Sequence, residues 1–267
     1  MSAAPRLTVV ALSEDSGQQG WSAVHRLVRH TLDLLVEGMD WQEGVQVVPR
    51  AEVPVYVQQV CAGNAWRSTR AADHPRRGQL FRYVAQQLDA GRDHPQWVMF
   101  HVDADRRWSQ RRTHPSDNLR QFEDIVRVGV KAALLAGRAP PDEATAAQLM
   151  TRLLVIPPYY AIEAWLYQAT GRARALCQQR PCQGAHRVTY DAWEANRAAL
   201  DAWDNPKDRA GPAGPHCLTD DDKDTLARNF PAQEVWSAAQ SYAAWVDGLL
   251  ADEALMNALK QAQHTAG

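Results

Sequence analysis

The sequence predicts an α/β fold in which a largely parallel sheet is flanked by helices and followed by a helical carboxyl-terminal extension. Two patterns predict this fold class. Short apolar, β-branched runs alternate with stretches of helical periodicity over roughly the first 160 residues. In the final third, strand patterns are scarce and helical patterns dominate. The chain has 267 residues, of which 45% are hydrophobic, so it is long enough to bury a large core.

The first elements are a strand, a helix and two further strands. The segment "RLTVVAL", Arg6 to Leu12, predicts a buried strand that ends at the polar "SEDSGQQG". Apolar residues then recur at helical spacing from Trp21 to Leu35 and predict a helix. The run "VQVV" predicts a strand, and the alternation in "VPVYVQQV", Val53 to Val60, predicts another.

The middle of the chain continues this alternation. Leu80 to Leu88 has the pattern of a helix, and Trp97 to Val102 has that of a buried strand. Asn118 to Ala136 carries apolar residues on one helical face, and "LLVIP" predicts a short strand. Strands that alternate with helices favour parallel pairing, because each helix returns the chain to the same end of the sheet.

The final third is expected to be helical. The segments "IEAWLYQAT", "YDAWEANRAALDAW" and "DDDKDTLARNF" and the long pattern from Val235 to Gln263 all have helical character. The clearest loop is "GPAGP", Gly211 to Pro215. We therefore expect an α/β core over residues 1–170 and a mainly helical part over residues 171–267 that packs on the core.

Charge and composition limit the class of protein. A formal net charge of −2 argues against a globally basic nucleic-acid binder, although arginines gather locally. No apolar stretch reaches the roughly 20 residues that span a bilayer, and the amino terminus lacks a signal-peptide pattern. Four cysteines at irregular spacing do not predict a disulfide scaffold. The sequence thus predicts a cytoplasmic protein with no membrane partner.

Acidic residues follow the predicted strands where a site is expected. Asp103 and Asp105 come directly after one strand, and Glu14 and Asp15 follow the first. Ligands of parallel α/β sheets gather at the carboxyl ends of the strands. Residues two apart in an extended segment point the same way, so we expect both aspartates to face one site. Their mutual repulsion is offset by a proton or a cation, and Mg²⁺ prefers such oxygen ligands.

A further acid, Glu163, stands in the apolar segment "IPPYYAIEAWLY". Taken alone, this glutamate is expected to form a buried ion pair with an arginine. Taken alone, the Asp-x-Asp pattern is equally compatible with a solvated loop or a helix cap.

Together these segments resemble a known family. "VVALSEDS" and "VMFHVDAD" look like the toprim fold of topoisomerases, primases and OLD-type nucleases, which places an acid after the first strand and an Asp-x-Asp after a later one. "IPPYYAIEAWLY" is similar to the Glu-x-Trp-Leu element of small stand-alone OLD-like proteins, several of which act in bacterial defence against phage. "NPK", "DDKDTLARNF" and "YAAWVDGLL" resemble the carboxyl-terminal half of that group. The usual first-strand Glu-Gly is absent, so either Glu14 or Asp15 is the equivalent acid.

The resemblance implies a metal-dependent nuclease. It implies that Glu14, Asp103, Asp105 and Glu163 hold one or two Mg²⁺ ions, with Mn²⁺ as a substitute, and that Lys207 or Lys223 neutralises charge on the phosphoryl group. Nucleic acid, with DNA as the expected form, would contact Trp66 or Trp108 and the arginines Arg67, Arg70, Arg76, Arg77, Arg106 and Arg107. It also implies a role in antiphage defence and an ATPase partner.

Other interpretations remain open. A toprim-like subunit with a weak or silent metal site would serve assembly, and glycosyltransferases and phosphatases also place an Asp-x-Asp after an apolar strand. Lys223 follows three aspartates and could simply pair with them. A zinc site is a further reading of five side chains, although they lack a Cys-x₂-Cys pattern: Cys177, Cys182, His186, His216 and Cys217.

Overall fold

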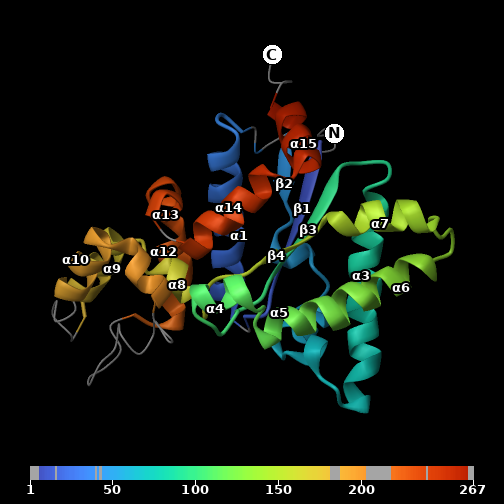
Figure 1. Cartoon of the computed structure of the whole chain (residues 1–267), viewed down its shortest axis with the longest axis horizontal. Helices are drawn as coiled ribbons and strands as arrows, with labels where there is room; N and C mark the ends of the chain where they lie inside the picture. Colours follow the sequence, from blue (N-terminus) through green and yellow to red (C-terminus); the bar gives the residue numbers. More distant parts are fainter. Residues whose placement is uncertain are drawn as a thin grey trace.

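The computed structural model describes residues 6–15, 17–39, 41, 44–180, 187–202, 218–238 and 240–263. Four strands form one parallel sheet with helices on both faces, and the carboxyl-terminal part is helical (Figure 1). This arrangement confirms the predicted fold class. The strands lie in the order β2-β1-β3-β4, and their bounds are β1 Leu7–Ser13, β2 Val45–Val47, β3 Gln96–His101 and β4 Leu153–Ile156.

The helices connect the strands and build the carboxyl-terminal part. Those that connect the strands are α1 Gln18–Leu35, α2 Val55–Ala62, α3 His74–Ala90, α4 Trp108–Thr113, α5 Asp117–Gln121, α6 Val128–Leu135 and α7 Glu143–Thr151, with a π-helical stretch at Phe122–Arg127. Those that follow β4 are α8 Glu163–Leu166, α9 Thr170–Gln178, α10 Arg187–Ala195, α12 Lys223–Arg228, α13 Ala232–Ala238, α14 Gln240–Leu250 and α15 Glu253–Gln263. Over the residues that the structure describes, no helix combines the length and the apolar character needed to cross a bilayer.

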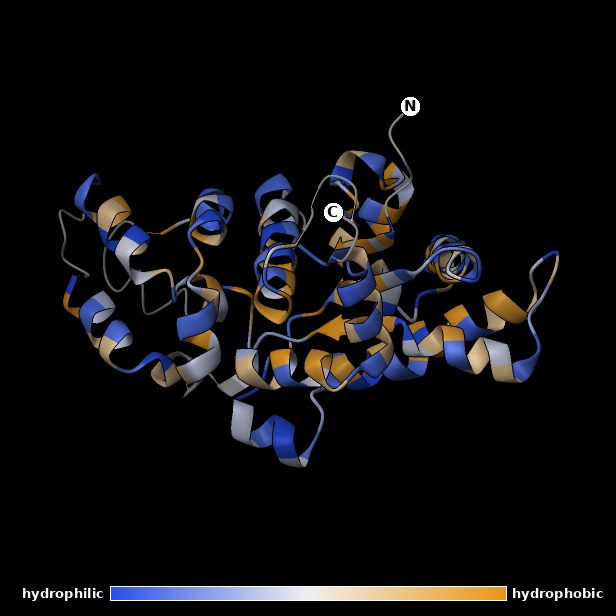
Figure 2. Ribbon diagram, turned by 90° about the horizontal axis from the view of Figure 1, so that it is seen from above, coloured by the Kyte–Doolittle hydropathy of each residue, from blue (hydrophilic) through white to orange (hydrophobic). Residues whose placement is uncertain are grey.

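The sheet separates two hydrophobic cores because side chains alternate along each strand. In β1, Val9 and Ala11 face a core built with α1 and the carboxyl-terminal helices, whereas Val10 and Leu12 face a core built with α2, α3 and α6. Figure 2 shows the resulting pattern, in which the strands are strongly hydrophobic and the surrounding helices have one hydrophobic and one hydrophilic side. All six residues of β3 are buried, as expected for a central strand covered on both faces.

The carboxyl-terminal helices pack on the same face of the sheet as α1. The buried rings of Trp165 and Trp245 stack with centroids 5.3 Å apart. The Tyr242 hydroxyl lies 2.7 Å from that of Thr31 in α1. One continuous hydrophobic core therefore extends from β1 to α15.

The order in which strands are added to the sheet reverses between β1 and β3. From β1 the chain goes to β2 on one side, and β3 and β4 are then added on the other. Connections leave opposite faces of a parallel sheet at such a point, and ligands of this class of fold bind outside the carboxyl ends of the two strands there. Glu14 and Asp15 follow β1, and Asp103 follows β3, so the predicted acids flank this position.

One sequence prediction about the elements is wrong. Val53 to Val60 is not a strand, because Pro54 precedes a helix, α2, that buries Val57, Val60 and Cys61 on one face. The valine alternation misled because it also satisfies a helical spacing of three and four residues, while Val55 is left 67% exposed. The long pattern from Val235 to Gln263 is helical as predicted and is divided among α13, α14 and α15.

Candidate functional site

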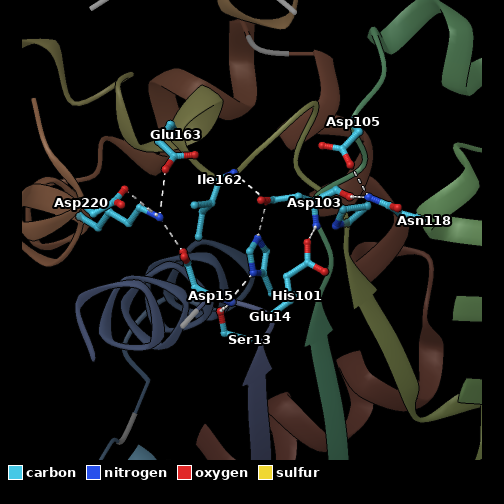
Figure 3. A network of polar contacts seen from close by, with 12 residues as sticks. Ser13, Glu14, Asp15, His101, Asp103, Asp105, Asn118, Ile162, Glu163 and Asp220 are labelled. Atoms are coloured by element: carbon cyan, nitrogen blue, oxygen red, sulfur yellow. Dashed lines mark hydrogen bonds and ion pairs between the residues drawn. The ribbon is translucent and has the colours of Figure 1, made fainter. Parts of the chain in front are cut away.

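The carboxyl ends of β1 and β3 bring Glu14 and Asp103 side by side. Ser13 and His101, the last residues of the two strands, are paired in the sheet register. One residue further along, the backbone N–H of Asp103 donates a hydrogen bond to Glu14 Oε1 (Figure 3). Acids 89 positions apart in the sequence thus become neighbours because parallel strands end at the same edge.

A buried histidine links the two strand ends. His101 Nδ1 lies 3.2 Å from the Ser13 hydroxyl, and its Nε2 lies 3.0 Å from Asp103 Oδ1. The same Asp103 oxygen accepts a hydrogen bond of 2.9 Å from the backbone N–H of Ile162. Burial opposes a charged imidazole, but the carboxylates of Asp103, Glu14 and Asp15 outweigh this effect and raise the pKa of His101. His101 therefore holds the Asp103 carboxylate in one orientation.

Glu14 is a poorly compensated carboxylate. Its Oε2 atom is buried and has no hydrogen-bond partner. Burial, followed by the negative charge of Asp103, raises the pKa of Glu14 to about 7. The charges of His101 and Arg67 and the hydrogen bond from Asp103 N–H act in the opposite direction and are weaker. A proton or a cation bound to the Glu14 carboxylate would neutralise this charge.

Asp105 faces a different partner from Asp103. Asn118 at the start of α5 donates one hydrogen bond to Asp105 Oδ2 and another, of 2.7 Å, to the Asp103 carbonyl. Asp105 has a left-handed backbone with φ 52°, and its carboxylate accepts a hydrogen bond from Asn118, whereas that of Asp103 is held by His101 and the Ile162 N–H. Burial and the charge of Asp103 raise the pKa of Asp105. The hydrogen bond from Asn118 and the charge of Arg67 act in the opposite direction but do not cancel this rise.

Glu163 and Asp15 share a buried lysine instead of joining the aspartate pair. The Lys223 ammonium lies 2.7 Å from Asp15 Oδ2, 2.9 Å from Glu163 Oε1 and 3.5 Å from Asp220 Oδ1 (Figure 3). The side chains of Lys223 and Glu163 are only 5% and 2% exposed. Burial opposes the ammonium charge, but Glu163 and Asp15 prevail and raise the pKa of Lys223. The ion pair expected for Glu163 exists, with a lysine in place of an arginine.

The acids predicted to meet at one site are thus divided into two groups. Glu14, Asp103 and Asp105 surround the end of β3, and Glu163 and Asp15 surround Lys223. Within the described ranges, no set of three or more His, Cys, Asp or Glu side chains is gathered closely enough to hold a metal ion. The first group nevertheless suits a hard cation, because it offers carboxylate oxygens and the unpaired buried Glu14 Oε2. Glu163 does not fit the same ion, since its charge is already paired with that of Lys223.

The predicted nucleic-acid contacts have different environments. Arg67 lies at the site, where it donates a hydrogen bond to Asn118 Oδ1. Arg77 donates to the Ser68 carbonyl, and Arg106 lies 3.5 Å from Asp117 Oδ1. Three of the predicted arginines are exposed: Arg70, Arg76 and Arg107.

Of the two tryptophans expected to stack with bases, one is buried inside the protein. Trp66 is fully buried, with edge-to-face contacts to Phe100 and Phe122, so stacking on it is ruled out. Trp108 is half-buried at the start of α4, and the guanidinium groups of Arg111 and Arg112 lie over its ring. Trp108 therefore remains a candidate for nucleic-acid contact.

Some predicted residues lie outside the described residues. Lys207 is one of them, and so are four members of the zinc hypothesis: Cys182, His186, His216 and Cys217. The fifth, Cys177, is buried in the core on α9.

Sequence reasoning missed three site residues: Ser13, His101 and Asn118. His101 had a usable signal, because it lies two positions before Asp103 on a strand and so shares its side of the sheet. Ser13 and Asn118 had none, since single polar residues at a strand end and a helix start are common. Their roles depend on which strand ends and helix starts meet in space.

The first turn of α1 packs against the Asp15 carboxylate through Gly20. A Cβ atom at this position would lie 2.4 Å from Asp15 Cγ and Oδ2, so an alanine would displace that side chain. We expect Gly20→Ala to lower the free energy of unfolding by about 1–3 kcal/mol, less whatever alanine gains in helix propensity.

The matched control is Gly248→Ala on α14, where an added Cβ meets no atom within 4 Å. It should be neutral or stabilising in the same urea denaturation series. Equal stability of the two variants would contradict the close contact at Gly20.

Comparisons with known proteins add no relative to these observations. No protein-family model, curated protein or solved structure matches the chain significantly. The case for a function therefore depends on the site itself: acids at the carboxyl ends of two adjacent parallel strands, one of which has a buried oxygen without a hydrogen-bond partner.

Proposed function

We propose that this protein is a Mg²⁺-dependent nuclease that cleaves phosphodiester bonds at the carboxyl ends of β1 and β3. The observation that carries the proposal is the half-buried Glu14 side chain, which lies beside Asp103 with its buried Oε2 atom unpaired and a pKa raised to about 7. A carboxylate in such a position favours a proton or a cation, and acids with perturbed pKa values are typical of functional sites.

Glu14, Asp103 and Asp105 would hold the ion, whose chemistry is to polarise the scissile phosphate and to lower the pKa of a bound water. The chain's own side chains prepare this arrangement. His101 orients Asp103, and Asn118 orients Asp105. Arg67 places a positive charge beside these acids, suited to a phosphate oxygen.

The toprim resemblance extends the proposal to DNA as substrate, to a cytoplasmic setting, and to antiphage defence with an ATPase partner. The exposed arginines Arg70, Arg76 and Arg107 would contact the phosphate backbone. They act through charge alone, so their loss would weaken binding without changing the chemistry.

The test is a plasmid-nicking assay with Mg²⁺, with Mn²⁺ and with EDTA. We expect cleavage that needs the divalent ion and falls by about 100-fold in Asp103→Asn, which keeps the side-chain shape but removes the charge. Asp124→Asn makes the same change at an exposed carboxylate and is expected to cleave as the wild type does. Equal cleavage by Asp103→Asn and the wild type would remove the nuclease proposal.

A second candidate is an interaction subunit with a silent metal site. The observation that favours it is the Lys223 ammonium, which already neutralises Glu163 and Asp15. Absence of cleavage together with absence of Mn²⁺ binding would favour this candidate.

A further inference from the structure

The acids at the end of the sheet would suit two cations, yet one of the two groups already contains a positive charge. Lys223 lies between Asp15 and Glu163 at 2.7 and 2.9 Å. A divalent ion such as Mg²⁺ would need these same oxygens at about 2.0–2.1 Å, where it would meet the ammonium. The lysine and a second metal ion therefore exclude each other.

Contacts of the residues before and after Lys223 fix the backbone at this position. Before it, a capping box joins Thr219 to Asp222, and Arg180 donates hydrogen bonds of 2.6 and 2.5 Å to the two oxygens of Asp222. After it, Asp224 is paired with Arg26 of α1 at 2.5 Å. These contacts fix the first turn of α12 and hence the base of the lysine side chain.

The burial of Lys223 also argues against contact with substrate. A lysine that neutralises a phosphoryl group must present its ammonium to the incoming ligand, but this side chain is 5% exposed. The groups with which it forms ion pairs in the described part of the chain, Asp15, Glu163 and Asp220, are carboxylates of the chain itself. The ammonium charge therefore stabilises the folded arrangement of these carboxylates.

We infer that Lys223 is a resident cation for Asp15 and Glu163, and that the protein binds one divalent ion, at Glu14, Asp103 and Asp105. The inference rests on the proposed function for the existence of that ion. It assigns Glu163 and Lys223 as positioning residues, which hold the segment after β4 and the start of α12 against the loop after β1.

The test is isothermal titration calorimetry of the full chain with MnCl₂. We expect one ion in the wild type and one in Glu163→Gln, because this glutamate does not hold the ion. Asp103→Asn should bind none. In Lys223→Met, where Asp15 and Glu163 lose their cation, we expect a second ion to bind and to raise the melting temperature more than in the wild type.

Two results would overturn the inference alone: two ions in the wild type, or loss of the ion from Glu163→Gln. No ion in the wild type would overturn the proposed metal site and this inference together. If Lys223→Met does not fold, the triple variant Asp15→Asn, Glu163→Gln, Lys223→Met removes all three charges and keeps the shapes. It should fold and bind one ion, and binding of two ions by it would contradict the assignment.

Discussion

Lys223→Met is expected to lower the free energy of unfolding by about 3–5 kcal/mol, because it leaves the buried Glu163 carboxylate without its counter-charge. Methionine keeps most of the side-chain length, so the loss is one of charge and not of volume. The aliphatic stem of Lys223 is buried as well, which makes an apolar replacement compatible with the packing. Urea denaturation in EDTA, which removes any metal contribution, measures the effect.

Lys131→Met provides the control for this loss. Lys131 also pairs with a glutamate, Glu143, at 2.8 Å, but the two side chains are 45% and 71% exposed. Exposed pairs contribute about 0–1 kcal/mol, so this variant should be nearly as stable as the wild type. Adding Glu163→Gln to Lys223→Met should recover part of the lost stability. Similar losses in the two lysine variants would show that burial of the Lys223 pair does not matter.

The stability of the wild type in EDTA is expected to fall as the pH rises from about 4.5 to about 7, and Glu14→Gln should remove much of this dependence. The pKa of Glu14 rises from 4.5 to about 7 on folding. The folded chain then binds more protons than the unfolded chain in this window, so the free energy of unfolding decreases with pH. At about 1.4 kcal/mol for each pH unit, the loss is at most about 3.5 kcal/mol.

His101 acts in the same direction, because its pKa is also raised and its stabilising charge is lost above that pKa. This contribution remains in Glu14→Gln, so the variant keeps a smaller dependence at higher pH. Denaturation at pH 5 and pH 8 measures the difference, with the exposed Glu123→Gln as a control that should follow the wild type. Mg²⁺ binds the ionised carboxylate and, on the proposed function, restores stability at pH 8. A Glu14→Gln profile identical to that of the wild type would contradict the raised pKa.

The division of the acids into two groups has a consequence for the carboxyl-terminal helices. The Lys223 ion pairs connect α12 to the loop after β1 and to α8. Trp165 on α8 stacks on Trp245 of α14 and donates a hydrogen bond of 2.8 Å to Ser241. Polar and apolar contacts therefore tie the helical part to the candidate site, so changes in that part can alter the site without touching its acids.

The sequence by itself determined the fold class and the edge of the sheet at which the acids of the candidate site lie. Apolar runs such as Gln96–His101 and the helical stripe of α1 have distinct periods, and parallel strands place acids that follow them at a common edge. The prediction from the sequence failed at Val53–Val60, because these eight residues satisfy the period of a strand and that of a helix alike. In the structure a helix begins directly after Pro54. Local pattern is therefore sufficient only where the run is long or the period is unambiguous.

Only the tertiary structure decided which charges are neighbours. The pairing of Glu163 and Asp15 with Lys223 joins positions up to 208 residues apart, and no local pattern encodes that distance. Asn118 became a partner of Asp105 because α5 begins beside the end of β3, and Ser13 became a partner of His101 because β1 and β3 end in register. Electrostatic partners are set by the approach of whole elements, whereas periodicity records only which face of one element is buried.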